Sequence, residues 1–354
     1  MRRLAGIPLA LIASVAPLVL MFALGGLLVW VPSGYYVITP GGSYDVGERL
    51  RIPEERREEI GRLAFTAVYA REANWARAIA GRLDRAAEVV PAEQIRPRGV
   101  SQADLRQINQ RLIEESKSVA AVVGLRAAGY EARITGQGAE VQQVLPGMPA
   151  DGLLGPGDVI VGVDGRPVGT AVEVIEATRR HQVGEEVRLT IVRDGQQQEL
   201  VVGTRAAADE PSRPVIGAAI STRAFNAELP FPVEIDTENI GGPSAGMMFA
   251  LGILDAVTDG LLTRGHAVAG TGTIAVDGTV GPIGGAAQKV IAAERDGAEV
   301  FLVPRENYED ARGRAGGIQV VPIDRFADAV RALCGLPPPP DAPPEPPPPC
   351  SLAL

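Results

Sequence analysis

The hydrophobic and polar positions divide the chain into stretches with different periods. From Leu4 to Val31 nearly every residue is apolar, and no charged residue occurs between Arg3 and Asp45. A helix needs about 20 apolar residues to cross a bilayer core, and a basic flank stays on the cytoplasmic side. The run therefore predicts a transmembrane anchor within residues 1–34, with the rest of the chain outside the cytoplasm. A cleaved signal peptide is the alternative, although its apolar core is usually only about 7–15 residues long.

Residues 35–117 mix the two regular periods. β-branched and aromatic residues predict strands over Tyr35–Thr39 and Leu63–Tyr69, and helical spacing predicts helices over Asn74–Ala87 and Gln102–Glu115. This stretch contains no group of residues that points to chemistry. We interpret it as a mixed α/β spacer segment.

Residues 118–205 show a sharper pattern. A predicted helix over 119–128 is followed by the alternating stretch AEVQQV, a Gly- and Pro-rich turn region, the strand DVIVGVDG, a helix over Thr170–His181 and two final strands. This order, and above all the motif PADGLLGPGDVIVGVDG, resembles a PDZ domain of the kind found in bacterial envelope proteases. The resemblance implies that a peptide C-terminus adds as a strand to an exposed sheet edge.

The resemblance also implies where such a peptide would lie. The groove would run between Ala139–Leu145 and the helix Thr170–His181, and the TGQG turn would bind the terminal carboxylate. The candidate carboxylate loop consists of Thr135, Gly136, Gln137 and Gly138. A plain β-turn, in a module that only spaces or gates its neighbour, is the alternative.

Composition excludes several classes of function. The net charge is −9, which argues against a partner bound through nucleic-acid phosphates. Only two histidines and two cysteines are present, too few for clustered metal or haem ligands, so we predict no metal and no cofactor. Cys334 and Cys350 either pair in an oxidising compartment or are unrelated thiols. The Pro-rich stretch over residues 336–354 predicts an extended or disordered tail.

The candidate chemistry lies in residues 206–335, where predicted strands and helices alternate. Ser244 stands in GGPSAG at the start of the apolar helix Ser244–Ala256, Thr271 stands in the Gly-rich strand AGTGTI, and Lys289 lies early on a second helix. A helix start offers backbone N–H groups to a developing oxyanion. The substrate and oxyanion loop would consist of Gly241, Gly242, Pro243 and Ala245.

A serine nucleophile needs a base. A Ser-His-Asp triad would have to use His266 or His181, and His181 belongs to the preceding module. Lys289 is the one lysine of this unit, and its apolar neighbours would favour the neutral amine that a base requires. Thr271 would hold that amine by a hydrogen bond. Lys289 follows Gln288 rather than a glycine, so the sequence does not match the ATP-binding Walker pattern.

GGPSAG, followed by TGTIAVDGTVGPIGGAAQKVIAAERDGAEVFLVPRENYED, resembles the proteolytic domain of Lon proteases, a Ser-Lys dyad family. The resemblance implies that Ser244 is the nucleophile, Lys289 the general base and Thr271 the residue that positions the lysine. It also implies a ring-shaped homo-oligomer. Two positions depart from the family: Gly241 replaces a frequent acidic residue, and Ala287 replaces a frequent second lysine.

The whole pattern resembles the membrane-anchored, Lon-like PDZ proteases of bacteria, without the ATPase module of Lon. The expected fold class is α+β multidomain: a transmembrane helix, a mixed α/β segment, a β-rich PDZ-like domain and a Lon-type α/β domain. The expected function is ATP-independent serine endopeptidase activity at the cell membrane. Expected partners are protein or peptide substrates and the lipid bilayer, with no nucleic acid and no ATP. The alternative is a membrane-tethered PDZ scaffold with an inactive protease fold.

Overall fold

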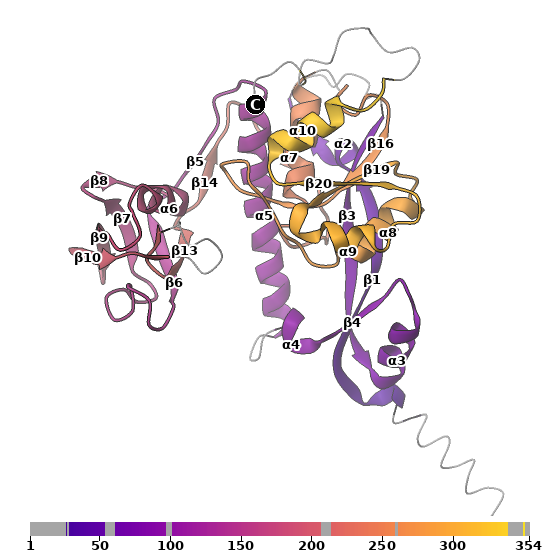
Figure 1. Cartoon of the computed structure of the whole chain (residues 1–354), viewed down its shortest axis with the longest axis horizontal. Helices are drawn as coiled ribbons and strands as arrows, with labels where there is room; N and C mark the ends of the chain where they lie inside the picture. The colour runs from indigo at the N-terminus through magenta and orange to yellow at the C-terminus, as the bar shows by residue number, and fades with distance from the viewer. Residues whose placement is uncertain are drawn as a thin grey trace, which may run out of the picture.

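The structure is a computed structural model of the chain. It describes residues 26, 28–53, 61–96, 101–206, 214–258, 261–338 and 350. Figure 1 shows a larger and a smaller domain on either side of a connection that runs through two short paired strands, β5 (Arg133–Thr135) and β14 (Asn226–Glu228).

The large domain is built on one mixed sheet with the strand order β20-β19-β16-β3-β1-β4. Its strands are β1 (Pro32–Asp45), β3 (Arg62–Asn74), β4 (Glu88–Pro91), β16 (Ala267–Gly270), β19 (Val300–Pro304) and β20 (Gln319–Ile323). The half from β4 to β3 is antiparallel, and the half from β3 to β20 is parallel. Every residue of β19 is buried, as expected for a parallel strand covered on both faces.

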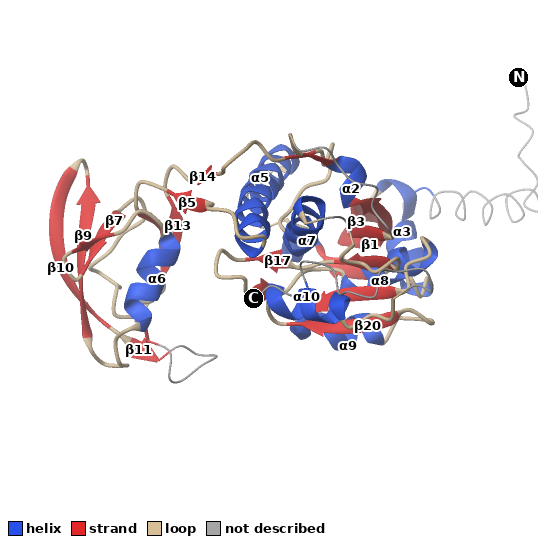
Figure 2. Ribbon diagram, turned by 90° about the horizontal axis from the view of Figure 1, so that it is seen from above, coloured by secondary structure: helices blue, strands red, loops and turns tan. Residues whose placement is uncertain are grey.

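Alternate residues of these strands face two helical layers, because successive side chains of a strand point to opposite sides. Phe65 and Leu302 face the layer of α5 (Gln102–Ala127), α7 (Gly246–Val257) and α10 (Phe326–Cys334). Ala64 and Phe301 face the layer of α8 (Ala286–Arg295) and α9 (Tyr308–Arg312). The result is a three-layer sandwich that holds α7 and α8 on opposite faces of the sheet (Figure 2).

Short elements complete the large domain. They are α2 (Val46–Arg49), β2 (Leu50–Arg51), α3 (Trp75–Leu83), α4 (Ala92–Ile95), β15 (Glu234–Ile235), β17 (Thr273–Ile274), β18 (Val280–Gly281) and the 3₁₀ helix η1 (Arg305–Asn307). The pair β17–β18 forms a hairpin that begins just after Thr271.

The small domain has its own sheet and its own apolar core. The sheet order is β10-β9-β7-β6-β13, and one helix, α6 (Ala171–Arg179), packs against it. Its strands are β6 (Ala139–Val144), β7 (Val159–Val163), β8 (Arg166–Pro167), β9 (Glu186–Arg193), β10 (Gln196–Gly203) and β13 (Ala218–Thr222); β11 (Arg205–Ala206) pairs with β12 (Pro214–Val215). Strand β13 therefore follows β10 in sequence but pairs with β6.

The structure does not set residues 35–117 apart as a spacer segment. Strands β1, β3 and β4 continue the sheet of β16, β19 and β20, and β3 pairs directly with β16. The helices predicted over 102–115 and 119–128 form the single helix α5, which lies along α7. The spacer interpretation was wrong because it weighed only residues near in sequence, whereas these strands are completed by partners about 200 residues away.

The predicted fold class needs one further correction, the removal of the transmembrane helix. In the part of the chain that the structure describes, no helix is long and apolar enough to cross a membrane. Before β1 the structure describes only Gly26 and residues 28–31, far fewer than the about 20 that a span needs. The rest of the predicted anchor lies outside the described residues.

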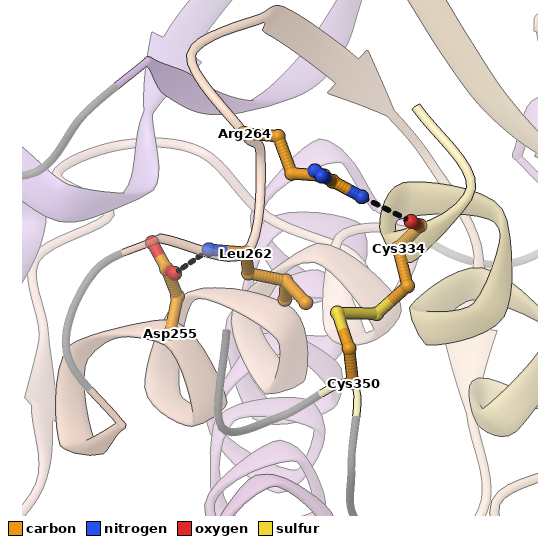
Figure 3. Close-up of a disulfide and its surroundings, with 5 residues drawn as sticks. All are labelled: Asp255, Leu262, Arg264, Cys334 and Cys350. Atoms are coloured by element: carbon orange, nitrogen blue, oxygen red, sulfur yellow. Dashed lines mark hydrogen bonds between the residues drawn. A yellow bond between two sulfur atoms is a disulfide. The ribbon is translucent and has the colours of Figure 1, made fainter. Parts of the chain in front are cut away.

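Cys334 and Cys350 form a disulfide (Figure 3). It joins the end of α10 to a residue 16 positions further along the chain. The carbonyl oxygen of Cys334 also accepts a 2.8 Å hydrogen bond from Arg264. Of the two alternatives for the cysteines, the structure favours the pair.

Candidate active site

Ser244 lies in the turn that leads into α7, on a loop of the large domain. The loop ends at Ala245, the residue before the first turn of the helix. The helix itself is almost wholly apolar and buried, so packing into the core holds it in place. The Ser244 carbonyl accepts a 2.7 Å hydrogen bond from Gly272 N–H, which ties the loop to the chain that follows β16.

Lys289 approaches Ser244 from the first turn of α8. Its Nζ lies 2.7 Å from Ser244 Oγ and 2.9 Å from Thr271 Oγ1. The side chain is almost fully buried, at 2% exposed. Gly285 has a φ of 71° at the start of α8. That left-handed turn suits glycine and directs the chain into the helix.

Thr271 completes a closed set of contacts with these two residues. It directly follows β16, in the centre of the sheet, and its N–H donates to Leu302 of the neighbouring strand. Its hydroxyl donates to the Ser244 carbonyl oxygen at 2.8 Å. Because the hydroxyl proton is used there, an oxygen lone pair remains to accept from Lys289 Nζ.

Burial lowers the pKa of Lys289 to about 7. The cause is loss of hydration, since an ammonium group is poorly solvated in an apolar surrounding. The Nζ contacts in the described part of the chain are two hydroxyls rather than a carboxylate, so no ion pair offsets this cost. A large fraction of the amine is therefore neutral near pH 7.

The loop before Ser244 is shaped by α5. Gly242 has a φ of 90°, which favours glycine, and its N–H donates to the Asn109 carbonyl oxygen at 2.8 Å. Ser116 Oγ donates to the Pro243 carbonyl oxygen at 3.1 Å. Sequence analysis missed both Asn109 and Ser116. Neither residue carries a motif, and only the packing of α5 on α7 brings them to the loop.

The structure shows how much space surrounds Gly241, which stands where Lon proteases frequently have an acidic residue. A Cβ atom at this position would lie 3.0 Å from Asn109 Cβ. A larger side chain would therefore require α5 to shift. The glycine lies at an exposed position of the loop where α5 approaches it closely from one side.

Backbone N–H groups near Ser244 are only partly available. Those of Gly242, Gly246 and Met247 donate to carbonyl oxygens. In the described residues, the N–H groups of Ser244 and Ala245 have no such partner, and Pro243 has none to offer. These two are the remaining candidates for binding an oxyanion.

The two histidines lie elsewhere. His266 Nδ1 contacts Glu299 at 2.7 Å, and Nε2 contacts the Pro337 carbonyl oxygen at 2.9 Å. His181 contacts Asp164 and the Ala177 carbonyl oxygen in the small domain. Neither ring takes part in the Ser244 arrangement. No group of three or more metal-ligating side chains occurs in the residues that the structure covers.

The predicted carboxylate loop was wrong. The N–H of Gln137 donates to Arg223 and that of Gly138 donates to Gly169, both at 2.8 Å. These donors are used to hold the end of β13 and the start of α6 together. Thr135 lies in β5, which pairs with β14. The four residues are structural, and they anchor the connection between the domains.

The predicted peptide groove is displaced by one strand. Strand β6 pairs with β7 on one side and with β13 on the other, so its edge is not open. Strand β13 is the outermost strand on this side within the described residues. Its end contacts α6, where Ala171 N–H donates to Thr222 Oγ1 at 3.0 Å. A peptide edge next to α6 would therefore be that of β13.

Comparison with known proteins agrees with these two structural units. Residues 105–204 match the PDZ domain family, and residues 237–323 match the Lon protease (S16) C-terminal proteolytic domain. The chain carries a PDZ domain and a Lon-type proteolytic domain. The PDZ match includes most of α5 and the small domain from β6 to β10, and it ends before β13; we call the small domain the PDZ domain. The Lon-type match lies within the large domain.

Several Lon proteases are similar to the chain over part of its length. Lon protease 2 of Bacillus subtilis is 34% identical over 114 residues, which are 32% of this chain and 20% of that protein. The Lon protease of Phenylobacterium zucineum is 29% identical over 191 residues, 51% of this chain and 22% of that protein. The chain thus covers only about a fifth of these relatives.

Solved structures are similar to part of the chain. The PDZ domain of an SdrC-like protein from Listeria innocua is 26% identical and covers 23% of this chain and 92% of its own, with a TM-score of 0.22. A solution structure from Geobacillus thermodenitrificans is 35% identical over 23% of this chain and 95% of its own, also with a TM-score of 0.22.

Proposed function

We propose that this protein is an ATP-independent serine endopeptidase in which Ser244 is the nucleophile and Lys289 the general base. The carrying observation is the 2.7 Å contact between Lys289 Nζ and Ser244 Oγ, made by a buried lysine whose pKa is lowered to about 7. A base with a pKa near the working pH is the most effective. The similarity to Lon proteases supports the same reaction class.

In this mechanism the neutral amine of Lys289 accepts the Ser244 hydroxyl proton while Oγ bonds to the scissile carbonyl carbon. The ammonium then gives its proton to the leaving amine as the C–N bond breaks. Water attacks the acyl-enzyme after losing a proton to Lys289, and Ser244 recovers its hydroxyl. Thr271 accepts a hydrogen bond from Nζ and thereby points the amine lone pair at Ser244.

The oxyanion of each tetrahedral intermediate would be bound by the N–H groups of Ser244 and Ala245. In the described structure neither N–H group donates to a carbonyl oxygen, whereas those of Gly242, Gly246 and Met247 do. A single oxyanion donor is typically worth about 2.7–4 kcal/mol of barrier. Gly242 leaves room for the substrate backbone beside this position, since a Cβ atom there would meet only Asn109 Oδ1, at 4.0 Å.

We propose that the PDZ domain captures protein substrates by strand addition to β13. This edge lies beside α6, and β13 is preceded by Gly217, whose φ of 83° makes a turn there. Successive N–H groups in such a turn can form a nest for a carboxylate. The substrate C-terminus would bind at this turn.

The disulfide between Cys334 and Cys350 supports a working place outside the cytoplasm, because disulfides persist in oxidising compartments. A homo-oligomeric ring is part of the same proposal, and measurement of the native mass by light scattering tests it.

The test of the proposed function is cleavage of unfolded casein by the full chain, with and without ATP. Cleavage should be lost in Ser244→Ala and in Lys289→Ala, and it should be indifferent to ATP. A serine-directed covalent probe should label the wild type at Ser244. Cleavage that persists in both variants would refute the assignment. No cleavage and no labelling of any form, with peptide binding intact, would favour a PDZ scaffold instead.

A further inference from the structure

A cavity of about 400 Å³ lies where the PDZ domain meets the large domain, and we call it the junction pocket. Its apolar lining comes from five separate segments: Val119 of α5, Ile134 of β5, Val172 of α6, Phe225 after β13, and Val276 after β17. All five side chains are only partly buried. The pocket thus presents apolar surface from both domains.

The junction pocket continues the open edge of the PDZ sheet. Ser221 and Thr222, the last residues of β13, lie in its lining. Thr222 Oγ1 accepts from the first N–H of α6, which holds the strand end against the helix start. A polypeptide paired with β13 would therefore run directly into the pocket.

The same pocket lies at the tip of a hairpin that starts at the candidate active site. Gly272 N–H donates to the Ser244 carbonyl, and Ala275 and Val276 of the β17–β18 turn line the pocket. Val276 follows Thr271 by five positions. A chain extends by at most about 3.3–3.6 Å per residue, so these positions are within about 18 Å of each other.

Charge sets the direction and the preference of the bound chain. Glu115, Glu173 and Glu176 line the pocket against a single guanidinium, that of Arg126. This excess of negative charge disfavours a terminal carboxylate and favours a basic side chain. The substrate C-terminus would then lie at the opposite end of β13, near Gly217, and the upstream residues would enter the pocket.

We propose that the junction pocket is a substrate subsite. It holds the stretch of an extended polypeptide between the PDZ edge and Ser244, and it selects an apolar residue next to Lys or Arg. This inference rests on the proposed endopeptidase function. Pairing along β13 takes about five residues and the path along the hairpin about five more, so cleavage falls about ten or more residues from the substrate C-terminus.

The test uses two 16-residue fluorogenic peptides with the same apolar C-terminal residue. One carries Leu-Lys and the other Leu-Asp at the sixth and seventh positions from the C-terminus. For the full chain, the KM of the Lys peptide should be about fivefold lower than that of the Asp peptide. The expected difference is modest because exposed charge pairs are individually weak. In the double variant Glu115→Lys/Glu176→Lys the preference should reverse.

The double variant Glu186→Lys/Glu199→Lys is the matched control. It makes the same charge change at exposed positions of β9 and β10, on the opposite side of the PDZ sheet. It should keep the wild-type preference. An unchanged preference in the double variant, or an equal change in the control, would overturn the subsite.

Binding separates this inference from the proposed function. The same peptides, labelled with fluorescein, are titrated against Ser244→Ala with and without the pocket substitutions, and anisotropy gives Kd. Reversal of the Kd ratio supports the subsite even if no form of the protein cleaves, an outcome that would refute only the proteolysis. Normal cleavage with equal Kd values for both peptides would refute only the subsite.

Discussion

At the residue scale, Lys289 combines two properties that rarely occur together in a lysine. It is buried without a carboxylate contact among the described residues, and its Nζ touches the hydroxyls of Ser244 and Thr271. Burial of an ammonium costs folding free energy, and the core around α8 has to offset that cost. The lowered pKa is what makes the residue suitable as a base.

The first residue-scale prediction concerns pH. Because the lysine must be neutral to accept a proton, kcat/KM should rise with pH through an apparent pKa of about 7 and level off above it. A pH series of peptide hydrolysis measures this limb. Lys289→Arg should be inactive across the range, since a guanidinium stays protonated. A rate that falls as pH rises from 6 to 8 would contradict the role.

The second residue-scale prediction concerns Thr271. Thr271→Val keeps the shape but removes the oxygen that accepts from Nζ, so kcat should fall about tenfold to a hundredfold with little change in KM. The pKa of the ascending limb should also fall, because a hydrogen bond that favoured the ammonium is lost. Thr271→Ser should restore most of the activity. Equal losses in both variants would indicate a structural role only.

At the scale of elements, the helix α5 joins the two parts of the fold. Its second half packs on α7, and Asn109 in the first half and Ser116 just past the middle hold the loop before Ser244. The close approach depends on Gly124. A Cβ atom there would lie 2.6 Å from the Ala250 carbonyl oxygen of α7.

This geometry reverses the usual effect of a helix substitution. Gly124→Ala should destabilise the protein by about 1–3 kcal/mol through overpacking, although alanine normally favours a helix by about 1 kcal/mol. Chemical denaturation measures the free energy of unfolding. Gln107→Ala, at an exposed position of the same helix, is the control and should stay within about 0.5 kcal/mol. A stabilised Gly124→Ala would show that the helices do not approach so closely.

At the scale of the whole molecule, the PDZ domain is inserted into the large domain through two paired strands. Thr135 and Asn226 face each other across the β5–β14 ladder, and Arg133 and Glu228 form a 2.6 Å ion pair beside them. The large domain therefore receives the chain back close to where it left. The two cores are separate clusters.

Removal of the insertion is the corresponding prediction. Replacing residues 136–225 by an Asn-Gly turn should leave a folded large domain, because this turn joins antiparallel partners. The shortened protein should unfold cooperatively and still react with a serine-directed probe at Ser244. It should lose the preference between the Lys and Asp peptides. A shortened protein that does not fold would mean that the PDZ domain supports the large domain.

The local sequence determined the chemistry that we predicted and much of the secondary structure. Three local features predicted the candidate site: the motif GGPSAG, the Gly-rich stretch around Thr271, and the single lysine of residues 206–335. In each of them the residue types alone indicate a chemical role. Alternating and helical patterns likewise predicted β6, β7, α6, β9 and β10 within a few residues, because a strand or helix that covers one core shows its period directly.

Only the tertiary structure decided which segments complete one another. From sequence, β1 and β3 were interpreted as part of a spacer, but in the structure β3 pairs with β16. Likewise β6 was expected to have an open edge, but it pairs with β13, which comes after the rest of the PDZ sheet in sequence. The N–H groups of Gln137 and Gly138 were expected to bind a carboxylate, but they donate to carbonyl oxygens of residues later in the chain. The hydrophobic pattern of a strand shows which of its faces is buried, but it does not show which distant strand pairs with its edge. The sequence therefore determined the elements, and the fold determined their partners.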